Sequence, residues 1–178
     1  KKSNELMAYS YSHLYGIPTT GLRFFTVYGP YGRPDMAYYK FVKSIIKGKN
    51  IDLYNHGNMQ RDFTYISDII ECVIRIINKV PSHKNSKSDT VSTPYQLYNI
   101  GSNNPITLKK LLRSIEKALG IRAQENLIVN QPGDVFETHA NIDELIRDIN
   151  YQPEVLLDEG IAKFVNWYKE IGIHIDSK

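Results

Sequence analysis

The chain has 178 residues, of which 42% are hydrophobic and 23% charged, a composition typical of one soluble globular domain with its own core. No apolar run approaches the roughly 18 residues of a membrane helix, and the net charge of +3 comes from scattered residues without a basic block. We therefore expect neither a membrane nor a nucleic-acid partner. The single Cys72 cannot form an intramolecular disulfide, which fits a reducing compartment, and we expect a cytoplasmic protein.

The first fifty residues predict a helix, a strand and a second helix. Residues 2–15 follow a helical pattern that stops at Gly16 and Pro18. Residues 20–28 are aromatic and β-branched, which indicates one buried strand, and a Gly/Pro loop follows. Residues 36–49 predict a helix with Gly48 as its C-terminal stop. Because the chain opens inside a helix and does not begin with Met, we expect an N-terminal part of the parent protein to precede it.

The middle of the chain predicts a short strand over 51–57 that ends in a turn, and a second one at Phe63–Ile66. Ser67 or Asp68 can then cap a helix. This helix has a broad apolar face, so we expect it to be mostly buried. The residues of that face are Ile69, Ile70, Val73, Ile74, Ile76 and Ile77.

Strands and helices continue to alternate in the second half of the chain. Residues 81–94 predict a solvated loop, and a strand over 95–101 follows. The next elements are a helix between Thr107 as cap and Gly120 as stop, a strand over 126–135 running into a turn, a short helix over 141–150 and an amphipathic helix over 158–172. Alternating strands and helices predict an α/β fold, in which ligands bind at strand ends.

Three charged residues lie in loops at the ends of predicted strands. Arg33 lies in the Gly/Pro loop, Arg61 precedes the strand at Phe63, and Asp134 follows a Pro-Gly turn. A guanidinium group binds two phosphate or carboxylate oxygens at once, so these loops could form one polar pocket. The alternatives are a solvated Arg33, an ion pair of Arg61 with Asp62 or Asp68, and a turn-capping Asp134.

Several segments carry a family resemblance. They are "KKSNELMAYSYSHLYG", "RFFTVYGPYGRPDMA", "MQRDFTYISDI", "YNIG" and "QPGDV". In this order they resemble the extended short-chain dehydrogenase/reductase (SDR) family of nucleotide-sugar epimerases and dehydratases, over essentially the whole chain. The resemblance implies the C-terminal part of such an enzyme, with the last strands and helices of a Rossmann sheet plus a small α/β substrate-binding domain. Residues 1–30, 62–80 and 95–102 would be Rossmann elements, and 31–61 and 103–178 mainly the substrate domain.

The resemblance also implies NAD as cofactor. Lys1 matches the lysine of a Tyr-x-x-x-Lys motif, which binds the nicotinamide ribose and favours the ionised tyrosine. The tyrosine, its helper Ser or Thr, and the glycine-rich NAD loop would lie before Lys1, so we expect the fragment itself to be inactive. A backbone group at Phe25 would contact the nicotinamide amide, although this ring can equally pack in the core.

Further matched positions imply a UDP-sugar site. Thr26 stands where many relatives have asparagine, and its hydroxyl could donate to a sugar carboxylate. The remaining expected contacts are Arg33 and Arg61 to the diphosphate or uronate, Tyr54 and Asn55 to uracil, Met36 to the base, and Asp134 to Arg61 or a ribose hydroxyl. Relatives often have arginine at Gln131, so Arg33 and Arg61 would carry more of the diphosphate. Each residue also has a structural interpretation, as a core, strand or turn residue.

The expected reaction inverts C4 of UDP-glucuronate to UDP-galacturonate by transient oxidation, in a polysaccharide pathway and in a homodimeric parent. Rival activities within the family are UDP-glucose 4-epimerisation, UDP-glucuronate decarboxylation and sugar-nucleotide 4,6-dehydration. A non-catalytic nucleotide-binding module or a nucleic-acid binder is the alternative from outside it. The five histidines have no metal-like spacing, so we expect no metal site.

Overall fold

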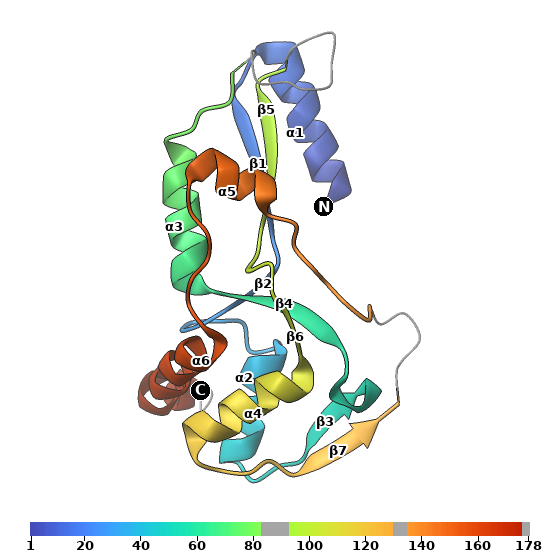
Figure 1. Ribbon diagram of the computed structural model, residues 1–178, viewed down its shortest axis with the longest axis vertical. Helices are drawn as coiled ribbons and strands as arrows, with labels where there is room; N and C mark the ends of the chain where they lie inside the picture. Colours follow the sequence, from blue (N-terminus) through green and yellow to red (C-terminus); the bar gives the residue numbers. More distant parts are fainter. Residues whose placement is uncertain (83–92, 130–134, 176–178) are drawn as a thin grey trace.

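The computed structural model describes residues 1–82, 93–129 and 135–175. Figure 1 shows an elongated molecule with two parts, joined where β4 and β6 run between them. The upper part contains α1 (Lys2–Tyr15), β1 (Thr19–Phe24), α3 (Ile66–Ile77), β5 (Tyr95–Ile100) and α5 (Asp143–Ile149). The lower part contains α2 (Ala37–Ile46), β3 (Ile51–Tyr54), η1 (Asn55–Gly57), α4 (Leu108–Leu119), β7 (Glu125–Ile128) and α6 (Leu157–Trp167). This α/β architecture confirms the predicted fold class.

The strands form three small sheets. β1 pairs in parallel with β5, and β3 pairs in parallel with β7. The third sheet has the order β2-β4-β6, where β2 is Thr26–Tyr28, β4 is Gln60–Tyr65 and β6 is Pro105–Thr107. β4 runs parallel to β2 and antiparallel to β6. β4 therefore brings residues from three distant parts of the sequence together.

The single buried strand expected over 20–28 is wrong in two respects. It breaks at Phe25 into β1 and β2, which belong to different sheets. Phe25 keeps its backbone N–H bonded to the carbonyl of Ile100 at 3.0 Å. The strand residues are also only partly covered, except for the exposed Phe24 and the buried Tyr28. The break turns the chain from the upper sheet toward the cavity described below.

The α3 helix differs from the expectation as well. It begins at Ile66, its N-cap is Tyr65, and no side chain caps it. Asp68 instead accepts hydrogen bonds from the Tyr151 hydroxyl at 2.8 Å and the Val155 amide at 3.1 Å. Only part of the apolar face is buried, because Ile69 and Ile76 face the core whereas three isoleucines are at least half exposed. The exposed residues are Ile70, Ile74 and Ile77.

Other helix boundaries confirm the sequence prediction. α1 covers the predicted residues and ends at Gly16 with φ 62°. Thr107 caps α4 by accepting from the Lys110 amide at 3.1 Å, and Gly120 ends it with φ 71°. The C-terminal helix is longer than predicted, because α6 continues into a π-helical turn, Tyr168–Gly172, and then α7, Ile173–Ile175.

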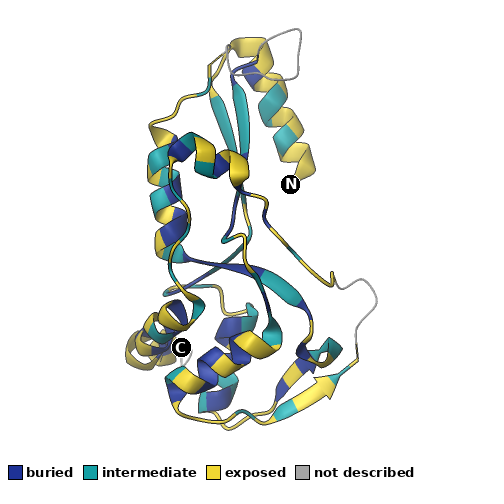
Figure 2. Ribbon diagram, in the orientation of Figure 1, coloured by how far each residue is buried: buried dark blue, intermediate teal, exposed yellow. Residues whose placement is uncertain are grey.

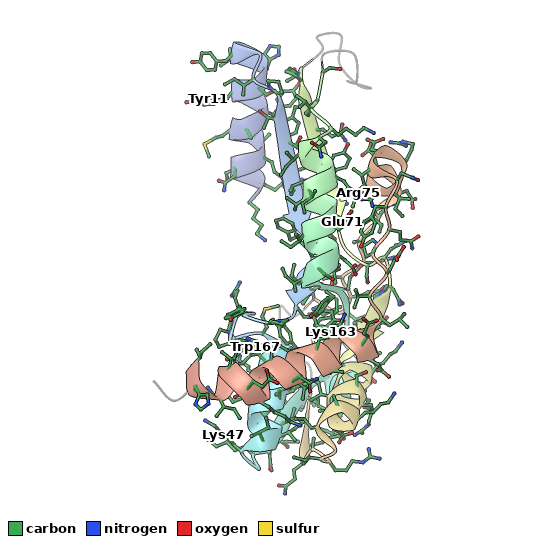
Figure 3. The ribbon with its side chains drawn as sticks, turned by 90° about the vertical axis from the view of Figure 1, so that its left-hand side faces the viewer. Tyr11, Lys47, Glu71, Arg75, Lys163 and Trp167 are labelled. Atoms are coloured by element: carbon green, nitrogen blue, oxygen red, sulfur yellow. The ribbon has the colours of Figure 1, made fainter. Side chains whose placement is uncertain are left out.

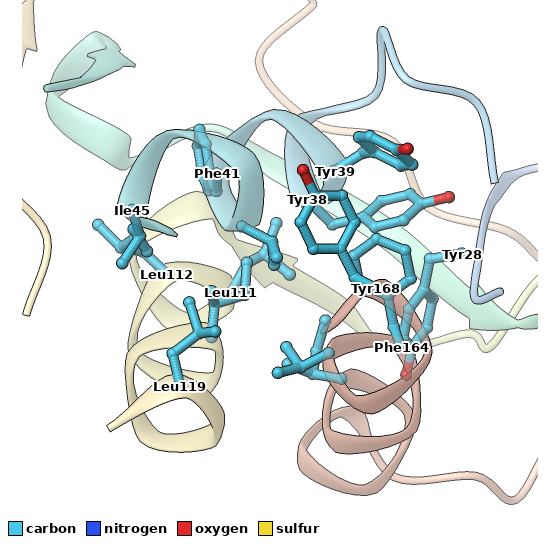
Figure 4. Packing of buried hydrophobic residues seen from close by; sticks show 14 of the residues in the cluster. Tyr28, Tyr38, Tyr39, Phe41, Ile45, Leu111, Leu112, Leu119, Phe164 and Tyr168 are labelled. Carbon is cyan, nitrogen blue, oxygen red and sulfur yellow. The ribbon is translucent and has the colours of Figure 1, made fainter. Parts of the chain in front are cut away.

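Two apolar clusters hold the molecule together. The larger one lies in the lower part, where Tyr38 of α2 packs edge-on against Phe164 of α6 with ring centroids 4.8 Å apart, and Leu111 and Leu112 of α4 close the other side (Figure 4). The smaller one packs α3 and α5 against β5, with Cys72 and Ile100 fully buried. Burial of such side chains is the main source of stability. The division into a Rossmann part and a substrate part stays a prediction.

Apolar surface remains exposed on α1. Figure 2 shows exposed residues along this helix, and Figure 3 shows Tyr11 on its outer side. Leu6, Tyr11 and Leu14 are each at least 60% exposed. Within the described residues, no helix is both long and apolar enough to cross a membrane.

Candidate functional site

A cavity of about 350 Å³ lies where the third sheet meets the lower part of the molecule. β2 contributes Thr26, the start of α2 contributes Met36 and Ala37, and β3 ends at the cavity with Tyr54. β4 contributes Arg61 and Phe63, and Met59 and Leu108 complete the wall. Four of the predicted site residues therefore share one cavity, namely Thr26, Met36, Tyr54 and Arg61.

Arg61 is the cation of this cavity wall. Its side chain is partly buried, and Nη1 donates to the carbonyl oxygens of Gln60 at 2.7 Å and Phe136 at 3.3 Å. Neither acceptor carries a net charge, so these two bonds orient the guanidinium group without neutralising it. Arginine stays protonated at any physiological pH. The cavity can therefore attract an anion, for which the guanidinium fork is suited.

A second cavity of about 380 Å³ adjoins the first. Tyr54, Ala37 and Leu108 line both, and the second also receives Asp35, Lys40 and Asp52. Tyr54 therefore lies between the two cavities. Beside these cavities, at the start of α2, burial raises the pKa of Tyr38 to about 12, so its hydroxyl stays neutral.

Arg33 does not line the 350 Å³ cavity. Its guanidinium group donates from Nε to Asp35 at 3.0 Å, and a second bond joins Nη2 to the other oxygen of that carboxylate. Both side chains are more than half exposed. The loop of Arg33 does reach the cavity through Met36, at its end. The two predicted arginines are thus not brought together around this cavity.

The other predicted residues lie apart from this cavity or outside the described chain. Asn55 follows Tyr54 in a left-handed conformation with φ 46° and does not line the cavity. Lys1 is exposed at the start of α1, in the upper part of the molecule (Figure 1). Phe25 packs against the smaller apolar cluster. Asp134, like Gln131, falls outside the described residues.

From the sequence, Asp62 is expected only as a possible ion-pair partner of Arg61. In the structure, its carboxylate is fully buried and accepts hydrogen bonds from Ser102, Asn103 and Ala140. A signal was available, because an aspartate inside a buried strand must find donors nearby. Sequence could not show that those donors come from residues about 40 and 78 positions away.

No three His, Cys, Asp or Glu side chains gather into a possible metal site among residues 1–82, 93–129 and 135–175. The cavity combines an arginine, a threonine hydroxyl and an aromatic wall, a set of groups suited to an organic anion. Strand ends are also where nucleotide-binding α/β folds hold their ligands.

Comparison with known proteins identifies the family. The sequence model of the NAD dependent epimerase/dehydratase family matches residues 1–101, more than half of the chain, and the chain belongs to this family. Protein CapI of Staphylococcus aureus is 54% identical over 176 residues, with 96% of this chain and 53% of the relative covered. A probable UDP-glucuronate 4-epimerase of Rhizobium meliloti (strain 1021) is 46% identical over 177 residues, with 96% and 52% covered.

A solved structure gives the same assignment. The crystal structure of UDP-glucuronic acid 4-epimerase from Bacillus cereus, in complex with UDP-glucuronic acid and NAD, superposes with a TM-score of 0.81 at 29% identity. The superposition covers 96% of this chain and 51% of that one. The chain thus spans about half the length of the relatives that it matches.

Proposed function

We propose that this chain forms the nucleotide-sugar-binding part of an NAD-dependent epimerase that inverts C4 of UDP-glucuronate to give UDP-galacturonate. The observation that carries the proposal is the cavity joining Thr26, Met36, Tyr54 and Arg61. Arg61 is chemically suited to the diphosphate, the Thr26 hydroxyl to the carboxylate of the sugar, and Tyr54 to the uracil base. Relatives named UDP-glucuronate 4-epimerase support this choice of sugar.

Arg61 would hold the diphosphate, because its charge is permanent and two of its N–H groups can reach two phosphate oxygens. Tyr54 would stack on uracil at the wall shared by the two cavities, with Met36 beside the base and Asn55 bonding it. The Thr26 hydroxyl would donate to the uronate. Arg33, once released from Asp35, would add a contact to the diphosphate or the uronate. From its position in the family motif, Asp134 would orient Arg61 or bind a ribose hydroxyl.

Lys1 and Phe25 would form part of a nicotinamide site. Bound NAD would supply a reversible hydride acceptor for C4 of the sugar. Lys1 offers an exposed ammonium group for the ribose hydroxyls. Phe25 offers its carbonyl oxygen to the nicotinamide amide, because its N–H already donates to Ile100. The family residues that the resemblance assigns upstream of Lys1 would complete this site, so we expect no turnover from the 178 residues alone.

The same proposal includes a homodimeric parent. The α1 helix carries exposed Leu6, Tyr11 and Leu14, and exposed apolar surface is often part of an interface. We expect Tyr11→Glu to shift the parent protein from dimer to monomer in sedimentation velocity. A mass unchanged by this substitution would rule out the α1 face as the dimer contact.

The activity is tested on a protein that contains this chain together with the half of its relatives' length that it does not span. Incubation with UDP-glucuronate and NAD is followed by proton NMR. We expect the anomeric signal of UDP-galacturonate to appear, and Arg61→Ala to slow it. Conversion of UDP-glucose with no conversion of UDP-glucuronate would contradict the proposed substrate.

A further inference from the structure

Asp62 is a buried carboxylate with an unusual set of partners. Oδ1 accepts from the backbone N–H and the hydroxyl of Ser102, at 2.7 and 2.8 Å. Oδ2 accepts from the backbone N–H groups of Asn103 at 3.0 Å and Ala140 at 3.2 Å. The residue itself is fully buried. Burying a carboxylate is costly unless it is well hydrogen-bonded, so this arrangement calls for a reason beyond packing.

These hydrogen bonds join three segments of the chain. Asp62 belongs to β4, Ser102 and Asn103 form the turn after β5, and Ala140 lies in the segment that leads to α5. The junction is tight, since a Cβ on Gly101 would lie 2.4 Å from the Cβ of Ala140 and 3.1 Å from Oδ2 of Asp62. Asn103 also adopts a left-handed backbone with φ 57°. The carboxylate therefore fixes a strained turn and a neighbouring segment against one strand.

The segment held by Asp62 is the one that orients Arg61. Residues 136–138 run along β4. The backbone N–H of Gln60 donates to the Phe136 carbonyl at 2.9 Å, and the backbone N–H of Thr138 donates to the Gln60 carbonyl at 3.2 Å. The Thr138 hydroxyl oxygen accepts weakly from the Asp62 amide at 3.4 Å. The Phe136 carbonyl accepts from Arg61 at 3.3 Å. Neighbouring side chains on a strand point to opposite faces, so Asp62 lies on the face of β4 opposite to Arg61.

We propose that Asp62 is a positioning residue that sets the direction of the Arg61 guanidinium group toward a nucleotide diphosphate. This inference rests on the proposed function, in which Arg61 binds the diphosphate. Asp62 itself does not touch the ligand. It holds residues 136–140 against β4, and through the Phe136 carbonyl this segment restricts the rotation of Arg61. Preorganisation of a charged side chain in this way raises affinity without adding a contact.

The test uses Asp62→Asn and two ligands that differ only in phosphate. An asparagine side chain has nearly the same volume, but its NH₂ group cannot accept the hydrogen bonds that the carboxylate accepts. Residues 136–140 should therefore be held less firmly against β4. We expect the affinity for UDP, measured by calorimetry, to fall about tenfold, and the affinity for uridine, measured by NMR titration, to stay within about twofold. The Arg61→Ala/Asp62→Asn double variant should bind UDP no more weakly than Arg61→Ala alone, because one residue acts through the other.

Two further variants separate positioning from general destabilisation. Asp68→Asn is the matched control, since Asp68 is also a buried carboxylate held by a hydroxyl and an amide, but its partners are Tyr151 and Val155 instead of the segment that contacts Arg61. It should leave the ratio of UDP to uridine affinity unchanged. Ser102→Ala removes one donor to Asp62 and keeps the backbone. It should lower the same ratio by a smaller factor, and it provides the reading if Asp62→Asn does not fold.

An equal loss of UDP and uridine affinity in Asp62→Asn would overturn the inference, and so would an undiminished effect on the Arg61→Ala background. An Arg61→Ala variant with wild-type UDP affinity would instead refute the proposed function. The two failures are therefore distinguishable in one set of titrations.

Discussion

Arg33 and Asp35 form a two-bond ion pair in the loop between β2 and α2, and Arg33 does not line the cavity that contains Arg61. Their side chains are 75% and 56% exposed, so solvent and salt screen the interaction. An exposed pair of this kind contributes roughly 0–1 kcal/mol. Opening it to a better anion would therefore cost little, whereas Arg61 is already directed by two backbone carbonyls.

The first prediction concerns this difference between the two arginines. Arg33→Ala should lower UDP affinity by about threefold or less in calorimetry, because the Arg33 side chain must leave Asp35 and become ordered before it helps. Asp35→Asn should raise the affinity slightly at low salt, since it frees Arg33. A loss from Arg33→Ala as large as that from Arg61→Ala would contradict the structural distinction.

Thr26→Val tests the recognition of the sugar. The substitution keeps the shape of a cavity-lining residue and removes its hydroxyl. A hydrogen bond to a charged group contributes about 1.5–3 kcal/mol, so the preference for UDP-glucuronate over UDP-glucose should fall by roughly tenfold or more. The measurement is the ratio of the two dissociation constants in wild type and variant. An unchanged ratio would assign Thr26 to the strand alone.

A third prediction concerns pH and the charge network on α4. The side chain of Glu116 is 5% exposed. Burial alone would raise its pKa, but Arg113 at 2.7 Å, the Ala123 amide at 2.8 Å and Arg122 hold the pKa below its usual 4.5. A lowered pKa in the folded state means that the charged form stabilises the fold above pH 4.5 and that this stabilisation is lost at lower pH.

Glu116→Gln should therefore lower the free energy of unfolding by about 1–3 kcal/mol at pH 7, with a difference that shrinks as the pH falls below 4.5. Urea titrations at pH 7, 5 and 3.5 measure it. The exposed Glu154 serves as the control, because its replacement by glutamine should change stability little at any of these pH values. A difference in the free energy of unfolding between wild type and Glu116→Gln that grows as the pH falls would contradict this prediction.

Cys72 offers a probe of the smaller apolar cluster. The thiol is fully buried, and burial together with the nearby Asp68 and Glu71 carboxylates raises its pKa to about 11. Because only the thiolate is nucleophilic, iodoacetamide at pH 8 should label the native chain at least about a hundredfold more slowly than the chain in urea. Equal labelling rates in the two states would mean that α3 does not cover Cys72 in solution.

The sequence predicted the elements with strong local signals and missed those defined by distant contacts. Gly16 and Gly120 end helices through their own backbone conformation, so α1 and α4 were predictable. The break at Phe25 was not, because it depends on Ile100, 75 residues away, as the acceptor of its amide. Likewise, the Asp68 position near a helix start suggested a cap, whereas Tyr151 and Val155 compete successfully for its carboxylate.

The candidate site divides in the same way. Thr26, Met36, Tyr54 and Arg61 follow from family motifs, and their common cavity gives those positions a physical basis. The role of Asp62 depends on three segments meeting at one carboxylate, which no local pattern encodes. The pairing of Arg33 with Asp35 is local, two residues apart, but its consequence becomes visible only when the cavity wall is known.

The proposed function depends most on Arg61 as the diphosphate ligand. Its direct test is calorimetric titration of UDP into the wild-type chain, Arg61→Ala and Arg75→Ala, the last as a control because Arg75 pairs with Glu71 on α3, in the other part of the molecule (Figure 3). We predict that Arg61→Ala weakens UDP binding at least tenfold whereas Arg75→Ala binds like wild type. Equal UDP affinity in all three proteins would contradict the central claim.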